Sequence, residues 1–167
     1  KMILAIDVQY NETNAVVAGV AFDMVNSTMI RDEYLSIVES VGEYVPGQFY
    51  LREIPCIAKL LEEHKLTPKL IIVDGYAWLD ANQKPGLGKR LYDHLGGTIP
   101  VIGVAKNPYK DAPQSFELLR GESKKPLHVS SEGISLELAK DMILSMSGKF
   151  RIPTLLKRAD QLCRSVK

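Results

Sequence analysis

The sequence predicts an α/β fold in which a mixed β-sheet carries helices on both faces. Its first part holds three strand-like runs in close succession, which are typical of an antiparallel meander. Strand-like apolar runs then alternate with amphipathic helix patterns, as in sheets with parallel strands. With 167 residues, the chain has the length of one domain with its own core. We therefore expect a single domain over residues 1–167.

The predicted meander begins almost at the first residue. Residues 2–10 and 15–22 are mostly apolar and β-branched, which indicates two buried strands. The polar residues 11–14 between them supply turn chemistry, so the two strands form a hairpin. Residues 30–38 predict a third strand.

The rest of the chain alternates between helix and strand patterns. The first helix has Pro55 in its first turn and an apolar stripe of Ile54, Ile57, Leu60 and Leu61. We then expect strands at 70–73, 100–105 and 128–130, a short helix at 89–94 and a loop-rich segment at 107–125. A helix opening at Ser135 carries Leu138, Met142 and Ile143, and a last helix from Pro153 carries Leu155, Leu156, Ala159, Leu162 and Cys163.

Composition excludes several classes of protein. The chain has 21 Lys and Arg against 20 Asp and Glu, which excludes a uniformly basic, histone-like protein but allows a local basic groove. Cys56 and Cys163 are far apart and lack a metal-binding spacing, so we expect a reduced, cytoplasmic protein. No apolar run reaches the roughly 18 residues of a membrane span, so no membrane partner is expected.

Charged residues follow three of the predicted buried strands. Asp7 and Asp74 each end one, and Lys106 ends a third. A single Asp at a strand end usually caps a turn, whereas two acids and a lysine at neighbouring strand ends indicate a site, since α/β sheets bind ligands there. Glu53, beside Arg52 at a helix start, is a candidate third acid; its alternative role is to complement the helix dipole.

Converging carboxylates repel one another unless a cation lies among them. Oxygen ligands without a Cys or His cluster favour Mg²⁺ or Mn²⁺ over Zn²⁺. Such an ion completes its shell with water and substrate phosphate, and Lys106 would bind the scissile phosphate. The predicted chemistry is phosphodiester hydrolysis. The basic pair Lys149 and Arg151 is a candidate phosphate contact, although such pairs are usually solvated surface.

Five short motifs in order resemble the endonuclease V family over nearly the whole chain. They are Asp7-Val8-Gln9-Tyr10, Tyr44-Val45-Pro46-Gly47 with Arg52-Glu53, Val73-Asp74-Gly75, Ile102-Gly103-Val104-Ala105-Lys106, and Pro153-Thr154 with Ala159-Asp160. The resemblance implies a ribonuclease-H-like fold. It also implies an Mg²⁺-dependent endonuclease, with Mn²⁺ as a substitute, that cuts 3′ to inosine in DNA or, for some members, RNA, and acts as a monomer.

The resemblance implies roles for particular residues. It makes Asp7 and Asp74 metal ligands, Glu53 the third catalytic carboxylate and Lys106 the catalytic lysine. It makes Tyr44, Val45, Pro46 and Gly47 a wedge that enters the nucleic acid and helps to expose the base, where an aromatic ring replaces lost stacking. Gly75 and Gly103 would lie where backbone passes close to nucleic acid, although turn geometry alone also explains glycine there.

Two segments depart from the family pattern. After Asp74-Gly75 the family's His, Pro and Arg are missing, and residues 129–135 lack a further His and Arg. Glu132 is a candidate replacement ligand for that histidine, although an exposed loop acid is the favoured interpretation of this residue. Three hypotheses follow: an inosine-directed endonuclease, a homologue that binds inosine-containing or structured nucleic acid without cutting it, and a nuclease for other irregular DNA structures.

Overall fold

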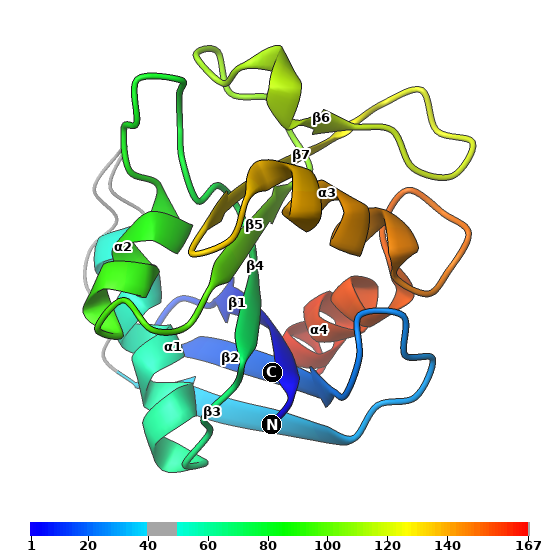
Figure 1. Cartoon of the computed structure of the whole chain (residues 1–167). Helices are drawn as coiled ribbons and strands as arrows, with labels where there is room; N and C mark the ends of the chain where they lie inside the picture. Colours follow the sequence, from blue (N-terminus) through cyan, green and yellow to red (C-terminus); the bar gives the residue numbers. More distant parts are fainter. Residues whose placement is uncertain (40–49, 167) are drawn as a thin grey trace.

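A computed structural model describes residues 1–39 and 50–166. Its centre is a seven-stranded mixed sheet with strand order β3-β2-β1-β4-β5-β7-β6 (Figure 1). Helices cover both faces of this sheet, so the predicted fold class is confirmed. The part of the chain that the structure describes holds no helix long and apolar enough to cross a membrane.

The meander forms as predicted. Strands β1 (Ile3–Tyr10), β2 (Ala15–Phe22) and β3 (Asp32–Val38) pair antiparallel in sequence order. Every residue of β2 is buried, because this strand lies between two others and under helices on both faces. The hairpin closes with a hydrogen bond of 2.8 Å from the Asn11 amide to the Asn14 carbonyl.

The strands that follow bring three strand ends to one edge of the sheet. Strand β4 (Leu70–Asp74) runs parallel to β1, and β5 (Val101–Ala105) runs parallel to β4. Ile6 lies opposite Val73, and Asp74 lies opposite Val104. The residues just beyond these pairs, Asp7 and Lys106, therefore lie on the same edge as Asp74.

The far side of the sheet is antiparallel. Strand β7 (Leu127–Glu132) pairs with β5, and the two-residue strand β6 (Glu117–Leu118) pairs with β7 after a 3₁₀-helix, η1 (Gln114–Phe116). The sequence predicted the strand at 128–130 that lies within β7, but only loop for η1 and β6, because two or three residues carry no measurable period.

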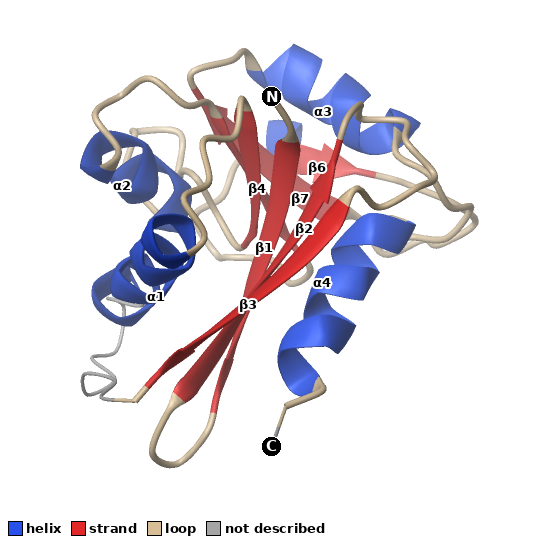
Figure 2. Ribbon diagram, turned by 90° about the horizontal axis from the view of Figure 1, so that it is seen from below, coloured by secondary structure: helices blue, strands red, loops and turns tan. Residues whose placement is uncertain are grey.

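Helices form the outer layers of the part of the chain that the structure describes (Figure 2). Helices α1 (Tyr50–Glu63) and α2 (Leu87–His94) cover one face, and α3 (Leu136–Ser145) and α4 (Thr154–Arg164) cover the other. Two expectations were wrong. Helix α1 starts early enough that Pro55 lies inside it rather than in its first turn, and Leu138 is 45% exposed because α3 buries Ala139 and Ile143 instead.

A buried arginine fixes the linker between α3 and α4. The Arg120 side chain is only 4% exposed, and its guanidinium donates to the backbone carbonyls of Ile143, Met146, Ser147, Gly148 and Phe150. A buried guanidinium needs this many acceptors, since an unpaired charge is costly to bury. The linker that enters α4 is therefore held firmly against the β6–β7 side of the sheet.

Candidate active site

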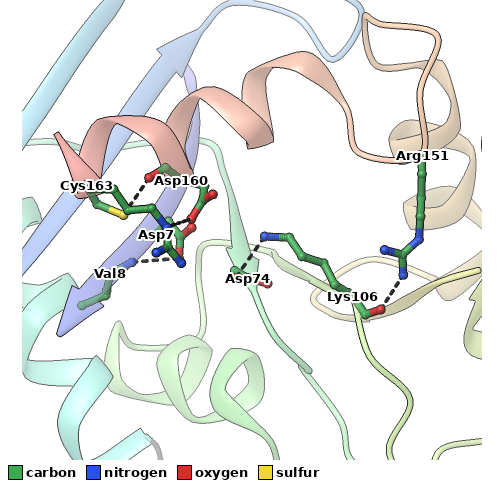
Figure 3. Close-up of polar contacts among 8 residues, drawn as sticks. Asp7, Val8, Asp74, Lys106, Arg151, Asp160 and Cys163 are labelled. Atoms are coloured by element: carbon green, nitrogen blue, oxygen red, sulfur yellow. Dashed lines mark hydrogen bonds and ion pairs between the residues drawn. The ribbon is translucent and has the colours of Figure 1, made fainter.

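Three of the four predicted catalytic residues stand on the edge formed by β1, β4 and β5. Asp7 lies within β1, directly after its buried apolar half, and its Oδ1 accepts a hydrogen bond of 2.9 Å from the Val8 amide. The ammonium of Lys106 lies 3.5 Å from Oδ2 of Asp74 (Figure 3). A small pocket of about 20 Å³ is lined by all three residues, so these charged groups face a common space.

Asp160 brings a further carboxylate to this site from α4. Asp7, Asp160 and Cys163 each offer a ligand atom, and these atoms all lie within 4.8 Å of one another. They form the one such group of His, Cys, Asp or Glu among residues 1–39 and 50–166. The Asp7 and Asp160 carboxyl groups share a hydrogen bond, and Arg164 donates to Oδ1 of Asp160 at 2.8 Å.

The sequence analysis included Asp160 in a family motif but assigned it no role in the site. Its one detectable signal is position, because Asp160 is an acid beside the apolar stripe of α4 that includes Ala159 and Cys163. A surface helix normally keeps its acids on the opposite face. The structure explains the exception, since this edge of α4 faces Asp7 on β1.

Cys163 supports the site without serving as a ligand for a hard cation. Its thiol is buried and donates to the backbone carbonyl of Asp160 at 3.2 Å. Burial, reinforced by the charges of Asp7 and Asp160, raises the pKa of this thiol to about 12. Only the thiolate is a good metal ligand, so the donor set here consists of carboxylate oxygens.

Nearby cations compensate the negative charge of the site's acids only in part. Burial, and then the charge of Asp74, raises the pKa of Asp7 to about 7. Burial, and then the charges of Asp74 and Asp7, raises the pKa of Glu53 to about 8. Loss of surrounding water also raises the pKa of Asp74, although Lys106 opposes this. Lys106, Arg52 and Arg164 offset only part of the negative charge, so the site fits a divalent cation that prefers oxygen.

The structure brings the four predicted catalytic residues into one electrostatic cluster but not into one ligand group. Glu53, in the first turn of α1, interacts with both Asp7 and Asp74. In the part of the chain that is described, the oxygens of Glu53 and Asp74 lie outside the group spanning 4.8 Å around Asp7 and Asp160. The carboxylate that joins Asp7 in this group is Asp160, to which the sequence analysis had assigned no role.

The other predicted site residues have different outcomes. Tyr44, Val45, Pro46 and Gly47 lie outside the described residues. Gly75 has φ +137°, a backbone conformation that favours glycine. At Gly103 a Cβ would come within 2.5 Å of the Ala77 amide nitrogen, so the chain's own backbone already requires glycine there.

Glu132 does not replace a missing metal ligand. It pairs with Val101 at the start of β5, whereas Lys106 follows the other end of that strand. Its carboxylate faces Lys89 instead, with Oε2 at 3.6 Å from the ammonium. Because the length of β5 separates Glu132 from the acids, its position argues against the candidate role as a replacement ligand, and Glu132 ends strand β7 instead of lying in a loop.

The mixed sheet with an acidic cluster on its parallel edge defines a nuclease domain of the ribonuclease-H-like class. The family model described as Endonuclease V matches residues 1–125. The chain belongs to the endonuclease V family.

Individual relatives agree with this assignment. Endonuclease V from Streptomyces avermitilis is 33% identical over 183 residues, which span 97% of this chain and 79% of the relative. The crystal structure of that organism's endonuclease V superimposes with a TM-score of 0.80 at 30% identity, covering 99% of this chain and 80% of the other. Ciona intestinalis endonuclease V, in complex with DNA that contains an inosine, shares the fold with a TM-score of 0.79 at 20% identity, covering 99% and 85%.

Proposed function

We propose that this protein is an Mg²⁺-dependent endonuclease that hydrolyses a phosphodiester bond 3′ to inosine in nucleic acid. The observation that carries the proposal is a cluster of carboxylates whose negative charge is only partly compensated, with Lys106 beside it. The carboxylates can bind a cation, and the lysine can bind a phosphate next to that cation. The inosine specificity is supported by the Ciona relative, which was crystallised with inosine-containing DNA. Mn²⁺ has the same preference for oxygen and would substitute.

Each residue has a proposed task. Asp7, Asp160 and, after a side-chain rotation, Asp74 would hold the ion, which when bound activates water and stabilises the departing oxygen. Lys106, held near Asp74, donates from its Nζ to an oxygen of the scissile phosphate. Glu53 suits proton exchange near neutral pH, because its pKa is about 8 before a cation is present.

Asp160 also bears on the choice between cutting and mere binding. The missing histidine at 129–135 motivated the hypothesis of a homologue that binds without cutting. The cluster nevertheless contains a carboxylate from α4 within 4.8 Å of Asp7. This further oxygen donor supports metal binding without that histidine, and we favour the endonuclease.

The roles of the remaining predicted residues complete the proposal. We propose that Tyr44, Val45, Pro46 and Gly47 form the wedge that exposes the base, and that the backbone at Gly75 and Gly103 passes close to the nucleic acid. We also propose that residues 1–167 act as one domain and as a monomer. Light scattering during size-exclusion chromatography tests the last point.

The decisive experiment is a nicking assay on a panel of end-labelled substrates, in which the inosine and control duplexes differ only in one base. Wild-type protein with Mg²⁺ or Mn²⁺ is compared with Asp7→Ala on inosine, mismatch, flap and branched substrates, in DNA and RNA. We expect one product, cut 3′ to inosine, that depends on the metal and on Asp7. Tight binding without nicking would support the non-cutting homologue, and nicking only of flaps or branches would support a structure-selective nuclease.

A further inference from the structure

We infer that Arg151 is a positioning residue for Lys106, an inference that rests on the proposed function. Arg151 lies at the end of the α3–α4 linker. Its Nη2 donates to the backbone carbonyl of Lys106 and, at 2.9 Å, to that of Pro126, while its Nε donates to the carbonyl of Lys125 at 2.9 Å (Figure 3). One guanidinium thus ties the end of β5 to the loop before β7.

The anchored carbonyl belongs to the residue whose ammonium faces the acids. Lys106 lies one residue beyond Ala105, the last residue of β5 that pairs with β7. The pairing of β5 with β7 therefore does not fix the backbone of Lys106. The hydrogen bond from Arg151 to the Lys106 carbonyl holds this backbone instead. From this anchored backbone the Lys106 side chain reaches to 3.5 Å from Asp74, with 36% of its surface exposed in the open cleft.

Arg151 is itself held in place. The residues just before it, 146–150, are fixed by the buried guanidinium of Arg120. The sequence allowed Lys149 and Arg151 to be a phosphate-binding pair, but the three donations of Arg151 aim its guanidinium at backbone oxygens. The guanidinium therefore binds the backbone around Lys106 and does not contact the substrate at the surface.

Arginine suits this task in a way that lysine does not. Its planar fork points donors at several acceptors in fixed directions, whereas an ammonium is a single flexible point charge. Arg151→Lys therefore keeps the charge and removes the fixed geometry. Since a displacement near 1 Å costs up to about 100-fold in rate, we expect kcat to fall about 10- to 100-fold. KM and the affinity for inosine duplex should change less than about twofold.

A double-mutant cycle tests whether Arg151 acts through Lys106. In a Lys106→Met background, Arg151→Lys should cause no further loss of kcat, since the effects of substitutions at two coupled residues are not additive. Arg158→Lys is the matched control, because Arg158 makes a forked pair with Glu33 on β3 and contacts none of the acids of the site. Arg151→Gln is the second variant, and thermal unfolding checks that every variant is folded.

A second readout does not depend on cutting. In metal-free protein with ¹³C-labelled lysine, Arg151→Lys should shift or broaden the Cε–Hε signal of Lys106, and Arg158→Lys should leave it unchanged. An unchanged signal, or additive losses of kcat in the cycle, would overturn the inference. If wild-type protein never cuts, the proposed function fails, and the lysine signal alone still decides whether Arg151 positions Lys106.

Discussion

Replacing Asp7 by asparagine should stabilise the metal-free protein above neutral pH. The folded state raises the pKa of Asp7 from 3.8 to about 7, chiefly through burial and the nearby charge of Asp74. A carboxyl group whose pKa is raised on folding holds its proton more tightly in the folded state. Stability is therefore lost as the pH rises from about 4 to about 7, and the loss is complete above that window.

The size of the effect follows from the same shift. A pKa difference of one is worth about 1.4 kcal/mol, so a change from 3.8 to about 7 corresponds to about 4 kcal/mol. Water in the open cleft screens part of this, and we expect Asp7→Asn to raise the free energy of unfolding at pH 8 by about 2–4 kcal/mol. At pH 4 the gain should nearly vanish, because Asp7 is then protonated in the folded state.

Urea unfolding at pH 4 and pH 8, with and without Mg²⁺, measures this. Wild-type protein should gain about 2.7 kcal/mol at an Mg²⁺ concentration 100 times the dissociation constant, and Asp7→Asn should gain much less. Asp23→Asn is the control, since Asp23 forms only an exposed pair with Arg31 and should change stability by less than about 1 kcal/mol. A variant that is less stable than wild type at pH 8, or equally stabilised by Mg²⁺, would refute the reasoning.

Three further variants test other parts of the account. Gly103→Ala should cost about 2–4 kcal/mol in urea unfolding, because the new methyl group meets backbone atoms; an unchanged midpoint would contradict this. Ser130→Ala should cost about 1–2 kcal/mol by the same assay, since its Oγ accepts a hydrogen bond of 2.8 Å from the buried Ala77 amide, and a neutral result would argue against it. Lys106→Met should slow nicking and move the acid limb of the rate–pH profile upward, because Lys106 lowers the pKa of Asp74; an unmoved limb would exclude that coupling.

The parallel edge of the sheet could be predicted from the sequence, because buried strands leave a strong signal. Strands β1, β4 and β5 are apolar runs, and a charged residue at the end of such a run stands out against them. Parallel pairing then places the three ends together without further information. The sequence alone therefore groups Asp7, Asp74 and Lys106.

The part of the site built by α4 could not be predicted in the same way. Asp160 lies near Asp7 only because α4 packs on β1 and β2. The hydrophobic periodicity of a sequence reports local structure, so it does not reveal a contact between opposite ends of a chain. The positioning contact of Arg151 was hidden for a similar reason, since a basic residue in a linker gives no sign that its partners are backbone carbonyls. The distance of Glu132 from the acids was hidden as well, because it depends on the antiparallel pairing that reverses the direction of β7 relative to β5.

The central claim is that these acids share one divalent cation, and anomalous diffraction from crystals soaked in Mn²⁺ tests it most directly. We predict one strong peak within bonding distance of carboxylate oxygens from both Asp7 and Asp160, with Asp74 turned toward it, and no such peak in Asp7→Asn crystals grown in the same way. A fully soaked wild-type crystal with no peak there, or with manganese bound only elsewhere, would contradict the account.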